Sequence, residues 1–251
     1  MQHCGKTATV AAIAAANETV KESFAVFRVI PDHVPVFGAR GAVLLQDYLV
    51  DLPLVAILRG LQPDKARDVG LALVDAGFRM IEVPLNSPEP FRSIEILATS
   101  LPENVLVGAG TVTDPDDVNG VRDVGGKLIV MPHGDLRVIR RAKELDLVCT
   151  PGVATPTEAF AALKAGADAI KIFPAESMPP IIVKAWRAVL PKHVIVLPVG
   201  GIRPDTMKDY VAAGANGFGL GSALFTPAMS VSEIGRNARD FATAWKALRA
   251  A

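Results

Sequence analysis

Two charged residues stand inside otherwise apolar stretches, and their types could do carbonyl chemistry together. Lys171 lies in "AIKIFP" and Glu82 lies in "MIEVPL". Burial lowers the pKa of an ammonium group, so Lys171 could attack a carbonyl as a neutral amine and form a Schiff base. Glu82 could then move protons as a general acid and base. Two structural alternatives stay open here: Lys171 extends from an outer face to water, or Glu82 forms a buried ion pair with Lys171 or Arg59.

Three further residues end apolar runs and could bind a substrate. Arg59 ends "LVAILR", and its guanidinium suits bidentate binding of a carboxylate, although it could equally cap a surface loop. Thr111 ends "VLVGAGT", where its hydroxyl could bind a carboxylate while the glycines before it let backbones approach closely. Pro132 ends "LIVMP", where it either shapes a pocket wall or terminates a strand.

Glycine pairs close the last two apolar runs. "VGG" covers Val199, Gly200 and Gly201, and "GLGS" ends in Gly221 and Ser222. Exposed backbone N–H groups on glycine suit an anion, and barrels often bind phosphate in the loops after their seventh and eighth strands. Ser222 would add a hydroxyl donor. The alternative is ordinary turn glycine, but two pairs in these two places favour phosphate binding.

The elements that must position these residues alternate regularly from Leu52 onward. Eight short runs read as strands, and they cover residues 54–59, 80–85, 105–111, 128–132, 147–152, 169–174, 194–201 and 217–222. Helix-length segments separate them, with Thr155, Pro156 and Glu158 forming a capping-box start and Gly166 a stop in one of them. Two others begin Pro-Asp and end Ala-Gly, at residues 62–78 and 203–215, and a last helix is predicted over residues 230–248.

Eight strand–helix units in about 200 residues predict an α/β fold of the (β/α)₈ TIM-barrel type, in which active sites sit at the carboxyl ends of the strands. A doubly wound open sheet would usually have fewer strands and one glycine fingerprint after its first strand. We therefore expect a single barrel domain over residues 52–251. Residues 1–51 show no clear period and are predicted to be an N-terminal extension, either poorly ordered or translated from an upstream start.

Composition excludes several classes of function. The 26 basic residues balance the 26 acidic ones, so the sequence has no basic excess for binding nucleic acid. No apolar run reaches the roughly 18 residues of a membrane span. Two cysteines, Cys4 and Cys149, cannot make a disulfide framework, which fits a reducing cytoplasm. Four scattered histidines show no metal-ligand spacing, so we expect no metal site.

The motifs together resemble a known family. "AILRG", "IEVPLNSP", "VGAGTV", "KIFPAE", "VGG" and "GLGS", in this order, are similar to the class I aldolases that cleave 2-keto-3-deoxy-6-phospho sugar acids. The likeness runs from about Leu52 to Leu248. Asn86, where gluconate enzymes tend to carry an arginine-bearing segment, and Val199, where they tend to carry threonine, favour the galactonate branch.

The resemblance implies cleavage to pyruvate and glyceraldehyde 3-phosphate, with Lys171 as the Schiff-base lysine and Glu82 as the proton-transfer residue. It implies further substrate-binding residues at the pyruvate and phosphate ends: Arg59, Thr111, Pro132, Val199, Gly200, Gly201, Gly221 and Ser222. It also implies a homotrimer without metal or organic cofactor. Alternatives are the gluconate epimer as main substrate, a phosphosugar isomerase or epimerase on the same barrel, and a phosphosugar-binding barrel without activity.

Overall fold

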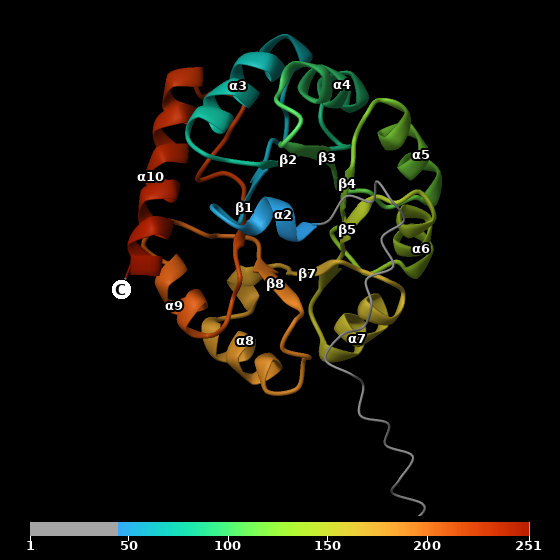
Figure 1. Ribbon diagram of the computed structural model, residues 1–251, viewed down its shortest axis with the longest axis vertical. Helices are drawn as coiled ribbons and strands as arrows, with labels where there is room; N and C mark the ends of the chain where they lie inside the picture. Colours follow the sequence, from blue (N-terminus) through green and yellow to red (C-terminus); the bar gives the residue numbers. More distant parts are fainter. Residues whose placement is uncertain (1–44, 251) are drawn as a thin grey trace, which may run out of the picture. The chain divides into compact units, whose positions relative to one another are not determined.

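The computed structural model describes residues 45–250, in which short strands alternate with helices (Figure 1). Most of the predicted N-terminal extension lies outside the described residues, and only residues 45–51 fall within them. In chain order the elements are α2 Leu45–Leu49, β1 Leu54–Ile57, α3 Pro63–Asp75, β2 Met80–Pro84, α4 Pro90–Ser100, β3 Leu106–Gly110, α5 Pro115–Asp123, β4 Leu128–Val130, α6 Leu136–Glu144, β5 Val148–Thr150, β6 Gly152–Val153, α7 Pro156–Lys164, β7 Ala169–Ile172, the 3₁₀ turn η1 Ala175–Ser177, α8 Pro180–Arg187, β8 Ile195–Pro198, α9 Met207–Ala212, β9 Phe218–Leu220 and α10 Val231–Ala250.

The strands form two parallel sheets. One has the order β5-β4-β3-β2-β1-β9 and the other the order β6-β7-β8. Helices α3 to α10 surround the strands in Figure 1. Because every pairing is parallel, the carboxyl ends of neighbouring strands lie on the same side, and the loops that follow them can build one site. The fold is therefore α/β with alternating strands and helices, as the sequence predicted.

Each of the eight predicted strand runs contains a strand. The fifth run is divided by Pro151 into β5 and β6, since proline has no N–H for the ladder. Its carbonyl still accepts a hydrogen bond from the N–H of Lys171 at 2.9 Å. A single parallel bridge joins Val199, just after β8, to Gly219 of β9.

Several strands stop earlier than predicted, which corrects the placement of eight candidate site residues. β1 ends at Ile57, β3 at Gly110, β4 at Val130, β8 at Pro198 and β9 at Leu220. The loops that follow these strands contain Arg59, Thr111, Pro132, Val199, Gly200, Gly201, Gly221 and Ser222. Thr111 adopts a left-handed backbone with φ 55°, which a β-branched residue rarely does and which cannot continue a strand. These side chains are thus aimed by loop conformation rather than by strand alternation.

The helix predictions hold with one correction. In α7 the Thr155 hydroxyl accepts from the Glu158 N–H while the Glu158 carboxylate accepts from the Thr155 N–H, which confirms the capping box. α9 begins at Met207, later than the Pro-Asp start predicted at Pro204. Residues 203–206 form a turn instead, because the Thr206 hydroxyl accepts from the Arg203 N–H at 3.0 Å.

Apolar side chains form two clusters. The larger one lies between the strands and the helices. The smaller, here called the inner cluster, contains mainly strand residues near the amino ends: Leu45, Val55, Met80, Leu106, Leu128, Val130, Val148, Ala169 and Leu197. Leu45 belongs to α2 and is 4% exposed. This short helix therefore packs against the inner cluster, although the sequence predicted no element there.

Candidate active site

The two charged residues of the apolar strands face one interior cavity. Glu82 is the third residue of β2 and Lys171 the third of β7, and they are 2% and 6% exposed. Both line a cavity of about 20 Å³, together with Thr150 and residues of the inner cluster. Strand alternation puts Met80 and Glu82 on the same face, so the inner cluster and Glu82 point the same way. The alternative in which Lys171 extends outward to water is therefore wrong.

Gly110 of β3 makes room for Glu82. Glu82 is paired with Gly108 in the sheet register, and Pro84 with Gly110. A Cβ placed on Gly110 would collide with the Glu82 carboxylate, at 2.6 Å from its Oε1, whereas a Cβ on Gly108 would meet the backbone of Leu128. Gly110 thus leaves space for a carboxylate on the neighbouring strand, a role that the sequence pattern did not reveal.

Burial controls the charge of Glu82. Among the described residues no hydrogen-bond donor reaches its Oε2. Loss of hydration raises the pKa of the Glu82 carboxyl to about 7, while the positive charges of Lys171 and Arg59 act to lower it. Glu82 can therefore exchange a proton near neutral pH, as a general acid and base requires.

Burial also controls the charge of Lys171. It lowers the pKa of the amine, Glu82 raises it, and Arg59 lowers it further. The Nζ lies 4.6 Å from the centroid of the Phe173 ring. None of the ion pairs within residues 45–250 involves Glu82, so the alternative of a structural ion pair with Lys171 or Arg59 is wrong. Lys171 is thus an amine poised toward its neutral, nucleophilic form.

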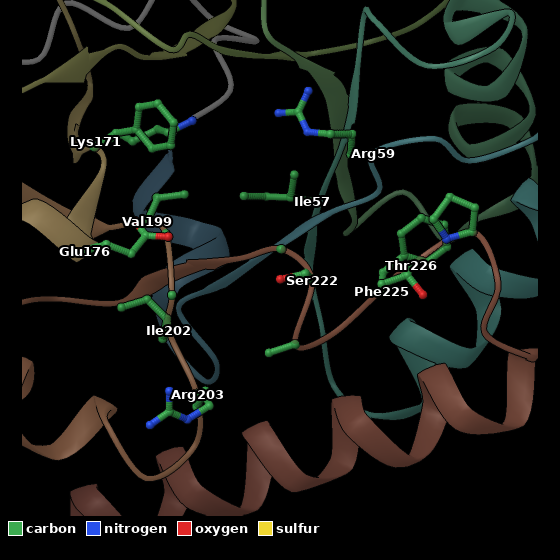
Figure 2. Close-up of a pocket in the computed structure, with 16 residues that line it drawn as sticks. Ile57, Arg59, Lys171, Glu176, Val199, Ile202, Arg203, Ser222, Phe225 and Thr226 are labelled. Atoms are coloured by element: carbon green, nitrogen blue, oxygen red, sulfur yellow. The ribbon is translucent and has the colours of Figure 1, made fainter.

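A larger cavity of about 700 Å³, here called the mouth cavity, lies beside Lys171 and Arg59 (Figure 2). Lys171, Ile57 and Val199 line both this mouth cavity and the small interior one, so Lys171 lies at the floor of the mouth. In Figure 2 the nitrogen-bearing ends of Lys171 and Arg59 point toward the space between them. Predicted site residues that line the mouth cavity are Arg59, Lys171, Val199, Gly200, Gly201, Gly221 and Ser222.

The Arg59 guanidinium is held by two neighbours. It donates through Nη1 to Asn86 Oδ1 at 2.5 Å and through Nη2 to Thr111 Oγ1 at 3.3 Å. Its loop is fixed as well, because the Gly60 N–H donates to Ser87 Oγ at 3.0 Å. Thr111 therefore acts on the site through Arg59 and does not line either cavity. The hydrogen bond between Arg59 and Asn86 was not predicted from the sequence, where Asn86 served only to distinguish the galactonate branch from the gluconate branch.

Pro132 is a predicted site residue that lies outside both cavities. It is half-buried after β4 and lines neither cavity. Its carbonyl packs closely against Gly152, where a Cβ would meet the Pro132 oxygen at 2.5 Å, and Gly152 is paired with Lys171 across the sheet. Pro132 thus contacts a neighbour of Lys171 on the next strand.

Sequence reasoning also missed several mouth residues. Phe173, Glu176 and Arg203 line the mouth cavity, and so do Phe225, Thr226 and Pro227 of the loop after β9. The first two belong to "KIFPAE", which follows the lysine strand, so their position at a strand end was an available signal. Thr150 faces the small cavity from β5, but a threonine inside a strand run gives no such signal.

The described part of the chain offers no metal site and no membrane anchor of the helical type. Within residues 45–250, no three His, Cys, Asp or Glu side chains gather in a way that could hold a metal ion. No helix in the same range is long and apolar enough to cross a membrane. The chemistry that these residues support is that of a nucleophilic amine beside a carboxyl group, with a guanidinium and glycine loops as anion-binding groups.

Comparison with known proteins identifies the family of this site. The family model "KDPG and KHG aldolase" matches residues 45–236. A probable 2-dehydro-3-deoxy-6-phosphogalactonate aldolase of Rhizobium meliloti is 47% identical over 189 residues, which cover 75% of this chain and 89% of that protein. The 2-dehydro-3-deoxy-6-phosphogalactonate aldolase of Escherichia coli is 44% identical over 195 residues, which cover 78% of this chain and 95% of that one.

A solved structure agrees with the sequence relatives. The structure described as native KDPGal superposes with a TM-score of 0.79 at 42% sequence identity, over 80% of this chain and 97% of that chain. The matched region of the family model contains every candidate site residue named above.

Proposed function

The chain belongs to the KDPG and KHG aldolase family and is a carbon–carbon lyase, and on that premise we propose that it cleaves 2-dehydro-3-deoxy-6-phosphogalactonate to pyruvate and glyceraldehyde 3-phosphate. The observation that carries the proposal is that Lys171 and Glu82 lie at the same cavity with shifted pKa values. Burial lowers the pKa of the Lys171 amine and raises the pKa of the Glu82 carboxyl to about 7. Both face the cavity beneath the mouth.

The first step forms the Schiff base. The neutral Nζ of Lys171 attacks the C2 carbonyl of the substrate, and loss of water gives an iminium. The Phe173 ring beside Nζ stabilises a positive charge there, since an aromatic face attracts cations. The iminium then withdraws electrons from the bond between C3 and C4.

The second step breaks the carbon–carbon bond. The Glu82 carboxylate, directly or through a water, takes the proton of the C4 hydroxyl as the C3–C4 electron pair moves into the iminium. Glyceraldehyde 3-phosphate leaves, and an enamine of pyruvate stays on Lys171. Glu82 returns its proton to C3, and water hydrolyses the resulting iminium to release pyruvate and the free amine.

Two anion sites orient the substrate in this proposal. Arg59, held by Asn86 and Thr111, binds the carboxylate of the pyruvate end. Pro132 supports that end indirectly, through its contact with Gly152, the residue paired with Lys171. The backbone at Gly200, Gly201 and Gly221 and the Ser222 hydroxyl bind the phosphate. Val199 lies between the two ends, since it lines both cavities.

The two parallel sheets, we propose, close into one (β/α)₈ barrel over residues 52–251, preceded by an extension over residues 1–51. The bridge between Val199 and Gly219 and the bond from Lys171 to Pro151 join the sheet edges on both sides and support closure. Exposed apolar side chains at Phe160, Ile181 and Val189 support assembly, proposed to be a homotrimer. The free thiol of Cys149 supports a location in the cytoplasm.

Borohydride trapping tests the Schiff base. Incubation with pyruvate and borohydride should add one reduced pyruvate adduct to the peptide that contains Lys171, and Lys171→Ala should abolish it. Lys184→Ala is the matched control, because Lys184 is an exposed lysine on α8. An adduct on another residue would refute the role of Lys171. Absence of any adduct with full activity would favour an isomerase or epimerase, which needs no Schiff base.

A second assay tests the substrate. Pyruvate release is measured side by side from the galactonate and gluconate 6-phosphate substrates, at matched concentrations. The proposal expects the larger kcat/KM for the galactonate epimer, because Asn86 and Val199 occupy the two positions that favour that branch. Preference for the gluconate epimer would keep the lyase chemistry and overturn the proposed substrate.

A further inference from the structure

The two glycine segments of the proposed phosphate site are not equally accessible. No heavy atom lies within 4 Å of the position where a Cβ would stand on Gly221. By contrast, the same position on Gly200 is 2.9 Å from Cδ of Glu176, and on Gly201 it is 2.9 Å from Cγ of Glu176. The side-chain position of Gly221 is thus open, whereas those of Gly200 and Gly201 are in close contact with the Glu176 side chain.

The backbone that carries Glu176 is fixed. Glu176 is in η1, and the Ala175 N–H at the start of this turn donates to the Val199 carbonyl at 2.9 Å. The Tyr210 hydroxyl lies 3.0 Å from the Ala175 carbonyl and 3.2 Å from the Met178 carbonyl, to which it can donate. These bonds tie the turn to the residue that precedes Gly200, so Glu176 starts from a defined place at the rim of the cavity.

The side chain of Glu176, in contrast, is held by no polar contact. It is exposed, and none of the hydrogen bonds or ion pairs within residues 45–250 involves its carboxylate. Figure 2 shows it beside Val199, on the cavity side. The guanidinium of Arg203, which lines the same cavity, is paired with Asp205 instead. Rotation of Glu176 away from the glycines therefore breaks no hydrogen bond or ion pair of the described chain.

We propose that Glu176 is a specificity-determining residue that competes with the substrate phosphate for the backbone at Gly200 and Gly201. This inference rests on the proposed function, in which that backbone binds phosphate. A phosphate dianion in this place would meet the negative charge of Glu176, so the side chain has to rotate out before the phosphate is bound. Glu176 thereby weakens the binding of the phosphorylated substrate and of the product glyceraldehyde 3-phosphate.

Kinetics in the direction of condensation isolate this effect. Pyruvate is combined either with glyceraldehyde 3-phosphate or with unphosphorylated glyceraldehyde, and the ratio of the two aldehyde KM values is compared between variants. Glu176→Gln keeps the shape and removes the charge. It should lower the KM of glyceraldehyde 3-phosphate relative to that of glyceraldehyde by about three- to tenfold, with a weaker dependence on salt. Inhibition by inorganic phosphate should become stronger by a similar factor.

Two further variants complete the test. Glu176→Ala removes charge and bulk together and should shift the KM ratio in the same direction. Glu103→Gln removes an exposed carboxylate in the loop before β3, at the opposite ends of the strands, and should leave the ratio unchanged. An unchanged KM ratio in Glu176→Gln overturns the proposal. A ratio shifted in the opposite direction also overturns it, and would mean that the Glu176 carboxylate binds the substrate.

The proposed role of Glu176 can fail without the proposed function failing. Trapping of pyruvate on Lys171 by borohydride needs no phosphate and is measured on the same protein samples. If trapping succeeds and the KM ratio does not move, the role of Glu176 fails while the Schiff-base function stands. If the wild-type protein traps no pyruvate, the proposed function itself fails.

Discussion

Glu82 on β2 and Lys171 on β7 face one interior cavity, and burial shifts the pKa of each toward its uncharged form. Each charge at the same time opposes the shift of the other, since the carboxylate raises the pKa of the amine and the ammonium lowers the pKa of the carboxyl. The same apolar interior therefore makes both the proposed nucleophile and the proposed proton carrier available in their uncharged forms.

Turnover should depend on the ionisation of Glu82. Because the pKa of its carboxyl is about 7 in the substrate-free chain, kcat/KM should fall as the pH drops below 7 and the base becomes protonated. Glu82→Gln should still form the borohydride-trapped adduct with pyruvate, while its kcat falls by about 10²- to 10⁴-fold. The measurements are the pH profile of kcat/KM for the wild type and the kcat of both proteins. A variant that turns over like the wild type would remove Glu82 from proton transfer.

The same pKa shift predicts a dependence of stability on pH. The carboxyl of Glu82 has a higher pKa in the folded chain, about 7, than the ordinary 4.5, so the unfolded state binds fewer protons between these values and stability falls as the pH rises. Between pH 4 and pH 8 the wild type should lose about 3 kcal/mol of unfolding free energy relative to Glu82→Gln. Urea unfolding at several pH values measures the difference, and parallel curves would contradict it.

Gly110→Ala should displace the Glu82 carboxylate, because the added Cβ would occupy its place. We expect kcat to fall at least about tenfold, because a displacement of about 1 Å is enough to weaken catalysis by a positioned group. Borohydride trapping on Lys171 should persist. Gly235→Ala in α10 is the matched control, since its Cβ would meet only ordinary contacts at 3.4 Å and beyond. Full activity of Gly110→Ala would mean that Glu82 does not need its present position.

Asn86→Ala should weaken binding of the substrate carboxylate by releasing the Arg59 guanidinium. We expect a rise in KM for pyruvate in the condensation direction of about three- to tenfold, with a smaller change in kcat, because one hydrogen bond to a charged group is lost. Asn119→Ala is a suitable control, since Asn119 also accepts from an arginine, Arg141, on the helices α5 and α6. A kcat loss without a KM change would assign Asn86 another role.

Leu45→Ala should destabilise the fold from the end of the strands opposite the active site. Leu45 of α2 is 4% exposed and lines the cavity that also contacts Glu82 and Lys171. Truncation should cost about 2–4 kcal/mol of unfolding free energy, measured by urea denaturation. Val50→Ala, at a side chain that is 65% exposed, should stay within about 0.5 kcal/mol of the wild type. Equal effects of the two changes would show that α2 does not pack as described.

The family resemblance and the proposed catalytic pair were both readable from the sequence, for local reasons. A charged residue in a strand otherwise made of apolar residues has to be explained by a partner or a function, and Glu82 and Lys171 each stand in such a strand. The capping box of α7 was also predictable because it is local: its two hydrogen bonds join residues three positions apart in the sequence.

The sequence by itself thus determined the alternation of strands and helices, the two charged residues in apolar strands and the glycine pairs, because these are patterns along one short segment at a time. Only the tertiary structure decided that Asn86 holds Arg59, that Gly110 makes room for Glu82, that Pro132 lies behind Gly152, and that Glu176 covers Gly200. Each of these is a contact between segments far apart in the chain. Such contacts depend on sheet register and on where each strand ends, which no local pattern specifies.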